Sequence, residues 1–315
     1  MICLDLFAFA TGCPAATWAA NLKREIKNTF ETHAFYRQGR GRRPDHFNGV
    51  RTWPLESQYA ATWPDEIRPP LQRLFDKISF REAMDPDAAY LLLDGLGNGG
   101  HKHLDANAVL QITRFGRIWL ADNDYFKAQV KYHNSMMVSR DGRSAPPPPY
   151  AELLGAGESP AAGFSHTRLN NYAGADWERA IGWHKADGTF VVLDRLTARG
   201  AGDYQFRQLW HGIGKATLSP EGLHLEQKGP DLWIQIAPGP ELRLADDPDL
   251  GQNWKGYPHA DPVVRSLAAV ATVRLKTGES YLFATAIPGT ATGHTKPWEI
   301  RPLRHLGGSG AKATD

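Results

Sequence analysis

Residues 107–122 read NAVLQITRFGRIWLAD, and this stretch decides the fold class. Two β-prone runs, Asn107–Thr113 and Arg117–Asp122, are separated by a short link that contains Phe115-Gly116. This pattern predicts an antiparallel hairpin, because a glycine in a short link suits the backbone of a tight turn. The sequence therefore predicts an antiparallel sheet around these residues.

Similar short runs continue along the chain and are bounded by glycine, proline, aspartate or asparagine. They are Ala89–Asp94, Val130–Ser139, Thr189–Thr197, Tyr204–Gly212, Leu232–Ala237, Ala268–Lys276 and Glu279–Ile287. No long helical period interrupts them, and strands that follow one another without crossover helices form antiparallel sheets. We therefore predict a mainly β protein, a large antiparallel β-sandwich preceded by a short helical and irregular segment.

The chain divides into three parts by composition. Residues 1–74 hold an amphipathic helical pattern over 15–32 and a proline-rich connector over 53–70, which suits neither a continuous helix nor a central strand. Residues 75–302 carry the strand signals and form the predicted sandwich domain. Residues 303–315 are rich in small residues and are predicted to be a disordered tail.

Composition excludes several classes of protein. The 315 residues are 42% hydrophobic and 22% charged, with a formal net charge of +2. Such a chain is not disordered, and its positive charge is too small to predict a nucleic-acid partner. The two cysteines, Cys3 and Cys13, are too few for a disulfide framework or a zinc finger. Asp5 and Pro14 interrupt the apolar stretch Ile2–Ala20, so no membrane span is predicted.

The most informative polar residues surround the predicted hairpin. On an extended strand alternate side chains share a face, so His101, His103 and Asp105 would converge. The hairpin would bring Asp122 beside them, and His133 would follow on a third strand. Imidazole nitrogen and carboxylate oxygen are ligands that zinc and similar divalent ions accept. The set therefore predicts a metal site, although His-x-His alone more often marks ordinary surface or core histidines.

The pattern Gly-His-x-His-x-Asp at residues 100–105, the strand that closes on Asp122 and the pair His133-Asn134 resemble the β-sandwich domain of heparinase II/III-like polysaccharide lyases. The resemblance covers most of the predicted sandwich. It implies a supersandwich-like fold and an enzyme that cleaves a uronate-containing acidic polysaccharide, such as alginate or a glycosaminoglycan, by β-elimination. In that reaction the uronate carboxylate is neutralised, a base removes the C5 proton and an acid protonates the departing C4 oxygen.

The same resemblance implies roles for individual residues. His101 matches a catalytic histidine that reaches into the active cleft. His103, Asp122 and His133 match the ligands of a structural Zn²⁺, or another divalent ion, and Asp105 would orient a ligand histidine. The candidate substrate-binding residues are Tyr125, Asn134 and Arg179, although Tyr125 suits packing better than contact with a sugar.

The predicted organisation departs from that family in one respect. In the family, a catalytic tyrosine and further substrate-binding residues come from an α/α-toroid domain that precedes the sandwich. Residues 1–74 can supply two or three helices and a connector, which is too little for a toroid. A separately encoded α/α-toroid domain is therefore an expected partner, alongside the acidic polysaccharide itself.

Two other function classes stay open. A non-catalytic carbohydrate-binding module would fit the missing toroid and the aromatic content, which offers stacking surfaces for sugar rings. A cupin-like metal-dependent oxidoreductase would fit His-x-His followed by His133, but such sites usually include a later glutamate, and the nearest acidic residue here is Asp105. The basic segments Arg37–Arg43 and Lys127–Lys131 suit an anionic ligand. The family resemblance implies a bacterial protein of the periplasm or the cell exterior, although no convincing export signal is seen.

Overall fold

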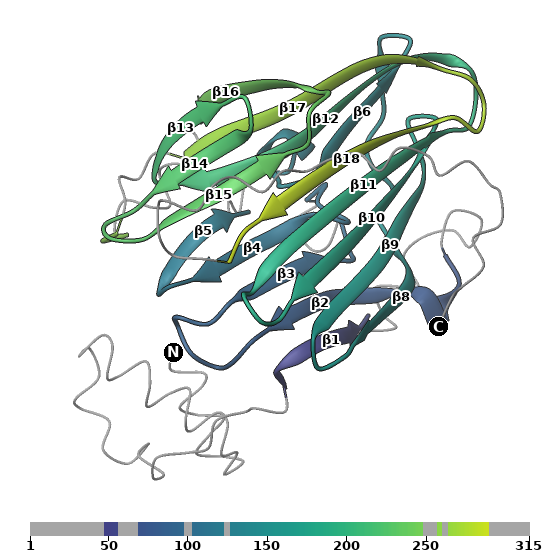
Figure 1. The fold of residues 1–315 in the computed structure, drawn as a ribbon. Helices are drawn as coiled ribbons and strands as arrows, with labels where there is room; N and C mark the ends of the chain where they lie inside the picture. Colours follow the sequence, from purple (N-terminus) through teal and green to yellow (C-terminus); the bar gives the residue numbers. More distant parts are fainter. Residues whose placement is uncertain are drawn as a thin grey trace, which may run out of the picture.

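The computed structural model describes residues 47–55, 69–97, 103–122, 127–247, 257–259 and 264–289. Within these ranges nearly all regular structure is antiparallel β-strand, arranged in two large sheets (Figure 1), and the predicted mainly β sandwich is confirmed. No helix in these ranges is long and apolar enough to cross a membrane. The predicted helix over 15–32, the basic segment Arg37–Arg43 and the tail 303–315 lie outside the described residues.

Among the described residues, ten strands form the first sheet. The order along its main path is β1 (Gly49–Pro54), β2 (Phe75–Arg81), β3 (Tyr90–Asp94), β4 (Val109–Arg114), β5 (Arg117–Ala121), β12 (Gly202–Ile213), β17 (Val264–Leu275) and β16 (Glu241–Asp247). The remaining two, β6 (Met136–Arg140) and β7 (Arg143–Ser144), join through the pairing of β6 with β12. Because β1 pairs with β2, this sheet takes in a strand that lies before the predicted boundary near Phe75.

The second sheet has eight strands in the same part of the chain. Their order is β13 (Lys215–Ser219), β14 (Gly222–Glu226), β15 (Asp231–Ile236), β18 (Ser280–Ile287), β11 (Thr189–Ala198), β10 (Ala175–His184), β9 (Ala162–Tyr172) and β8 (Glu152–Glu158). Two short 3₁₀ helices, η4 (Leu71–Arg73) and η5 (Val130–Tyr132), accompany the sheets. The sheets face each other as the two layers of a sandwich (Figure 1).

The hairpin that the sequence predicts around Phe115 is present. Arg114 at the end of β4 pairs with Arg117 at the start of β5. Phe115 and Gly116 between them both have positive φ, 57° and 65°. A turn with positive φ at both central residues matches the twist of the flanking strands. β4 and β5 therefore pair as antiparallel neighbours in one sheet. The predicted hairpin is therefore confirmed.

The predicted strand over Val130–Ser139 is wrong in its first half. Residues Val130–Tyr132 form η5, and β6 begins only at Met136. Val130 and Tyr132 are buried, so the apolar residues that suggested a strand pack instead as one helical turn. As a consequence His133 lies in a connection between η5 and β6 rather than on a strand.

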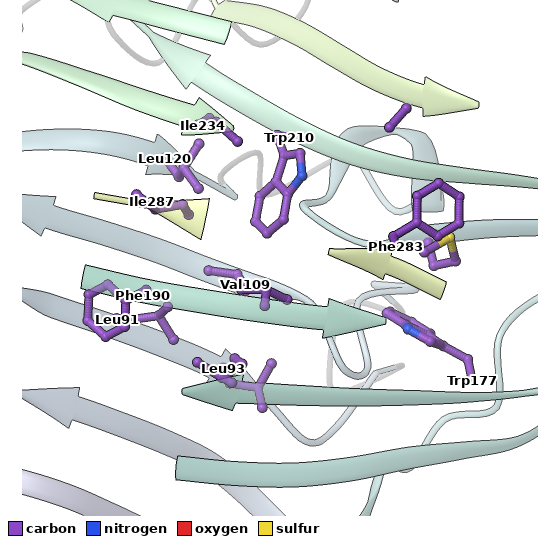
Figure 2. Packing of buried hydrophobic residues seen from close by; sticks show 14 of the residues in the cluster. Leu91, Leu93, Val109, Leu120, Trp177, Phe190, Trp210, Ile234, Phe283 and Ile287 are labelled. Carbon is purple, nitrogen blue, oxygen red and sulfur yellow. The ribbon is translucent and has the colours of Figure 1, made fainter. Parts of the chain in front are cut away.

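The core lies between the two sheets and is rich in aromatic side chains. Along β10 the buried positions alternate, as expected for a strand with one face inward, and they include Trp177 and Trp183. Trp177 of one sheet and Trp210 of the other lie in the same apolar cluster, and neither is exposed (Figure 2). One polar residue, Arg179, occupies the inward row of β10, and it connects the core to the site described next.

Candidate metal centre

Three ligand-type side chains come together beside the ten-stranded sheet: His103, Asp105 and His133. One nitrogen or carboxylate oxygen from each lies within 4.8 Å of the others. His103 Nδ1 and an oxygen of Asp105 are 3.9 Å apart, and the rings of His103 and His133 have centroids 5.5 Å apart. The group joins the connection between β3 and β4 to the connection between η5 and β6.

His103 and Asp105 lie in the connection before β4, and a tight turn begins at Asp105. Residues 103–105 form no strand, so the predicted extended arrangement is wrong for this described part. The carbonyl of Asp105 accepts a hydrogen bond from Ala108 N, and Asn107 N donates to the carbonyl of Asp94. Asn107 has a φ of 68°, in the left-handed region that asparagine tolerates better than most residues. This turn aims Asp105 at His133.

Asp122 holds His133 in position. The Nδ1 of His133 lies 2.5 Å from Oδ1 of Asp122, and the two side chains are 1% and 2% exposed. A carboxylate only accepts, so this ring nitrogen carries a proton, and in the neutral ring the lone pair is on Nε2. Asp122 follows β5, whose hairpin with β4 places it here, and its N–H donates to the carbonyl of Leu110.

The buried charges shift the titration of the site. Burial disfavours the charged imidazole, but the hydrogen bond and charge of Asp122, together with the charge of Asp105, raise the pKa of His133. Burial also raises the pKa of Asp105, and the charge of Asp122 adds to that effect. Two carboxylates, Asp105 and Asp122, are therefore buried close together, and a bound cation would offset the cost of burying their negative charge.

The donor set fits a divalent metal ion. Asp105 Oδ1, Asp122 Oδ2 and His133 Nε2 are buried, and none has a hydrogen-bond partner among the described residues. Buried polar atoms are normally satisfied, so three such atoms around one group indicate a missing ligand. Imidazole with carboxylate suits zinc and several other divalent ions. The group His103, Asp105 and His133 could hold such an ion, and the structure does not identify the metal.

The two aspartates are arranged differently from the predicted ligand set. The sequence resemblance placed Asp122 among the ligands and Asp105 behind them, whereas the structure puts Asp105 in the convergent group and Asp122 behind His133. Asp122 stays a candidate for a further ligand through Oδ2. Of the other predicted residues, the catalytic candidate His101 and the substrate-binding candidate Tyr125 lie outside the described residues.

Asn134 and Arg179, the other two predicted substrate contacts, lie in the interior. Both are fully buried. Asn134 Nδ2 donates to the carbonyl of Val109, and its Oδ1 accepts from His211 N. Arg179 donates from Nε and Nη2 to the two oxygens of Asp194, at 2.8 and 3.0 Å. These contacts indicate a structural role, and contact with a substrate by either residue stays a prediction.

Two buried carboxylates near the site, Asp194 and Asp94, were not among the predicted site residues. Asp194 lies at the centre of a buried network in which Trp177 Nε1 and Gln208 Nε2 also donate to it. Asp94, at the end of β3, is bonded by Lys77 Nζ at 2.9 Å, and burial together with the charge of Asp105 raises the pKa of Asp94 to about 7. Each aspartate follows an apolar run, Leu91–Leu93 or Val191–Leu193, and that placement is the sequence signal that could have indicated them.

Solved structures with a similar fold include heparinase III, with a TM-score of 0.59 and 12% identity, matched over 89% of this chain and 44% of that chain. Heparan sulfate lyase HepC from Pedobacter heparinus gives a TM-score of 0.58 at 12% identity, over 91% of this chain and 44% of that one. A heparinase III gene product with methylated lysines gives 0.60 at 11% identity, with coverages of 91% and 44%.

These likenesses establish the fold and a distant structural relationship. At such low identity they assign no activity. The chain spans less than half the length of the three matched structures. No protein-family model matches the sequence, and the search of curated proteins gave no match.

Proposed function

We propose that this chain is the β-sandwich portion of a polysaccharide lyase that acts on a uronate-containing acidic polysaccharide. The observation that carries the proposal is the fold likeness to heparinase III and to a heparan sulfate lyase over about nine tenths of the chain. The sequence pattern around His103 and His133 supports the same assignment, because the structure brings these residues into one buried group.

The proposed reaction is a β-elimination that consumes no water and needs no oxidant. The C5–H bond and the C4–O bond of the uronate break, a C4–C5 double bond forms, and the proton is passed on to the departing oxygen. His101 is the proposed acid or base of this chain. It stands two residues before His103 in the sequence.

The proposed metal is Zn²⁺ in a structural role. His103, Asp105 and His133 would hold it, with His133 oriented by Asp122. When bound, the ion would supply positive charge beside the two aspartates, and its coordination would join the β3–β4 connection to the η5–β6 connection. Its ligands then cannot serve as the proton donor or acceptor, which leaves that role to His101.

A second candidate function is a non-catalytic carbohydrate-binding module. It rests on the same fold likeness, which at 12% identity assigns no activity. A sandwich of this fold that only binds would hold an acidic glycan and release it unchanged.

The deciding experiment follows the ultraviolet absorbance of unsaturated uronyl ends during incubation with heparan sulfate, heparin and alginate. The lyase proposal expects a rise with at least one of them, which His101→Ala removes without lowering the melting temperature. His224→Ala is the matched control, since His224 pairs with Asp231 at 2.7 Å far from this group in the sequence. Binding of a glycan without product selects the module, and neither binding nor product contradicts both.

A further inference from the structure

A hollow lies on the outer face of the ten-stranded sheet. It has a volume of about 310 Å³ and is lined by residues of β1, β2 and β3 and of the segments next to them. On β2 and β3 the inward residues, such as Ile78 and Leu91, are fully buried between the sheets. The alternate residues Lys77, Arg81 and Tyr90 line the hollow and so point away from the core.

An indole forms one wall of this hollow. Trp53 on β1 is 37% exposed, although its ring lies 5.2 Å from that of Phe47. Its Nε1 donates to Ser79 Oγ, 3.3 Å away, which fixes the orientation of the ring. A large aromatic ring that is held in place and partly open to solvent offers an apolar surface at little cost in conformational freedom.

A cation faces the same space. The guanidinium of Arg81 lies 4.0 Å from the centre of the Tyr90 ring, a distance typical of a cation–π contact. Among the described residues Arg81 makes no ion pair with a carboxylate, unlike its neighbour Lys77, which bonds both Asp76 and Asp94. Tyr90 therefore positions a positive charge that no carboxylate of the described residues pairs with.

The hollow is connected to the candidate metal centre. Lys77, on its floor, bonds Asp94 at 2.9 Å, and the carbonyl of Asp94 accepts a hydrogen bond from Asn107 N in the turn that carries Asp105. The register pairs Lys77 with Asp94 and Arg81 with Tyr90 on adjacent strands, so the charges follow one face of the sheet toward the centre.

We infer that this hollow is a subsite for one acidic sugar unit, which stacks on Trp53 and places its carboxylate or sulfate against Arg81. The inference rests on the proposed function for the polymeric ligand, but it requires binding only and no product. An aromatic face beside a cation matches a sugar ring that carries an anionic group, whereas a neutral sugar would use only the aromatic face.

Titration calorimetry with the full chain tests this subsite. The probes are an alginate oligosaccharide, a heparan sulfate oligosaccharide of similar length and a neutral malto-oligosaccharide. The first carries carboxylates alone and the second also carries sulfates, so the two identify which anion Arg81 prefers. Trp53→Ala should raise the Kd for the preferred acidic probe about tenfold, and Trp53→Phe, which keeps a ring, should restore most of the affinity.

Arg81→Gln should raise the Kd by a similar factor of about ten. The Kd should also depend less on salt concentration, because the variant lacks the attraction between Arg81 and the anionic group, which salt screens. Trp233→Ala is the matched control: this half-buried tryptophan stacks on His224 in the other sheet, with ring centroids 4.6 Å apart. A melting curve for each variant shows whether the fold is retained.

The results separate this subsite from the lyase proposal. Weakened binding by the Trp53 and Arg81 variants, with no product from the wild-type chain, supports the subsite and contradicts the lyase. Product formation with a Kd that neither variant changes supports the lyase and overturns the subsite. The subsite is also overturned if the wild-type chain binds neither acidic probe, or if it binds the neutral probe equally well.

Discussion

Arg179 Nη1 donates a hydrogen bond of 2.8 Å to the backbone carbonyl of Asn107. This bond joins β10 of the eight-stranded sheet to the turn that carries Asp105 in front of β4. The same nitrogen lies 3.2 Å from the carbonyl of Asn134, next to His133. A single guanidinium in the core therefore holds both connections that form the candidate metal centre.

Arg179→Met should destabilise the fold strongly. The substitution removes the partner of Asp194, which is fully buried, and leaves a carboxylate without its compensating charge. Breaking a buried pair from one side costs about 3–5 kcal/mol. We expect a loss of that size in the free energy of unfolding, measured by urea denaturation.

Two further variants test whether the unpaired buried charge causes the loss of stability. Replacing both partners, Arg179→Met with Asp194→Leu, should recover part of the loss, because no unpaired charge stays in the core. Arg199→Gln breaks a pair with Asp176 in which Arg199 is 46% exposed, so it should change stability little. Equal losses for the buried and the exposed pair would contradict this account.

Asn107→Ala should lower stability and weaken metal binding together. Asn107 has positive φ, and its Oδ1 accepts a hydrogen bond from Thr167 Oγ1 at 2.6 Å in the interior. Alanine would strain the backbone and remove the nearer acceptor of the Thr167 hydroxyl, which keeps only the Arg179 carbonyl at 3.2 Å, at a combined cost of about 2–3 kcal/mol. Asn171→Ala is the control: Asn171 also has positive φ but is exposed, so only the backbone term of about 1 kcal/mol is expected.

Removal of the metal should lower the melting temperature. A site built by the folded chain adds its binding energy to the stability of the fold, so chelation should destabilise the wild-type protein and Zn²⁺ should restore it. His103→Ala, Asp105→Ala and His133→Ala should each abolish this metal-dependent shift. Elemental analysis of the purified protein identifies the metal.

Asp122→Asn distinguishes a ligand from an orienting residue. If Asp122 only holds His133, the variant should keep the metal with an affinity lowered about 10–100-fold. Complete loss of the metal would instead make Asp122 a ligand, as the family resemblance implied. His224→Ala, in a similar histidine–aspartate pair on β14, should leave the metal-dependent shift unchanged.

The sheet architecture was predictable because its signals are local. The β4–β5 hairpin follows from two β-prone runs and a glycine in the turn. The sequence reading missed β9 and β10 although both alternate between buried and less buried residues. Their inward rows contain polar residues, Thr167 and Arg179, whose partners come from distant parts of the chain, and a periodic search for apolar residues alone passes over such rows.

The candidate centre was predictable in membership but not in geometry. His103, Asp105, Asp122 and His133 were all identified, because these residue types lie near one hairpin. The roles of the two aspartates depend on the turn at Asn107 and on η5, which a long-range contact with Arg179 helps to hold. Spacing along a strand could not show this arrangement.

Glu158 joins the edges of the two sheets. It ends β8 and accepts hydrogen bonds from Val50 N and Arg51 Nη1 on β1, at 3.2 and 2.8 Å, and from Lys185 Nζ at 2.8 Å. Partial burial alone would raise the pKa of Glu158, but these bonds lower it to about 2 from an ordinary value of 4.5. The carboxylate therefore stabilises the fold above pH 4.5, and that contribution is lost as the pH falls toward 2.

Glu158→Gln should lower the free energy of unfolding at neutral pH by about 1 kcal/mol, a value kept small because solvent screens a partly exposed carboxylate. The difference from the wild-type protein should shrink as acid protonates Glu158, and it should also shrink in high salt. Glu241→Gln is the matched control, since the only ion pair of Glu241 among the described residues is with Arg243 on its own strand. Urea denaturation across the acidic range measures both variants. If the difference in the free energy of unfolding between the Glu158 variant and the wild-type protein stayed constant across pH, the charge of Glu158 would not contribute. The loss would then come from changed packing between β1 and β8.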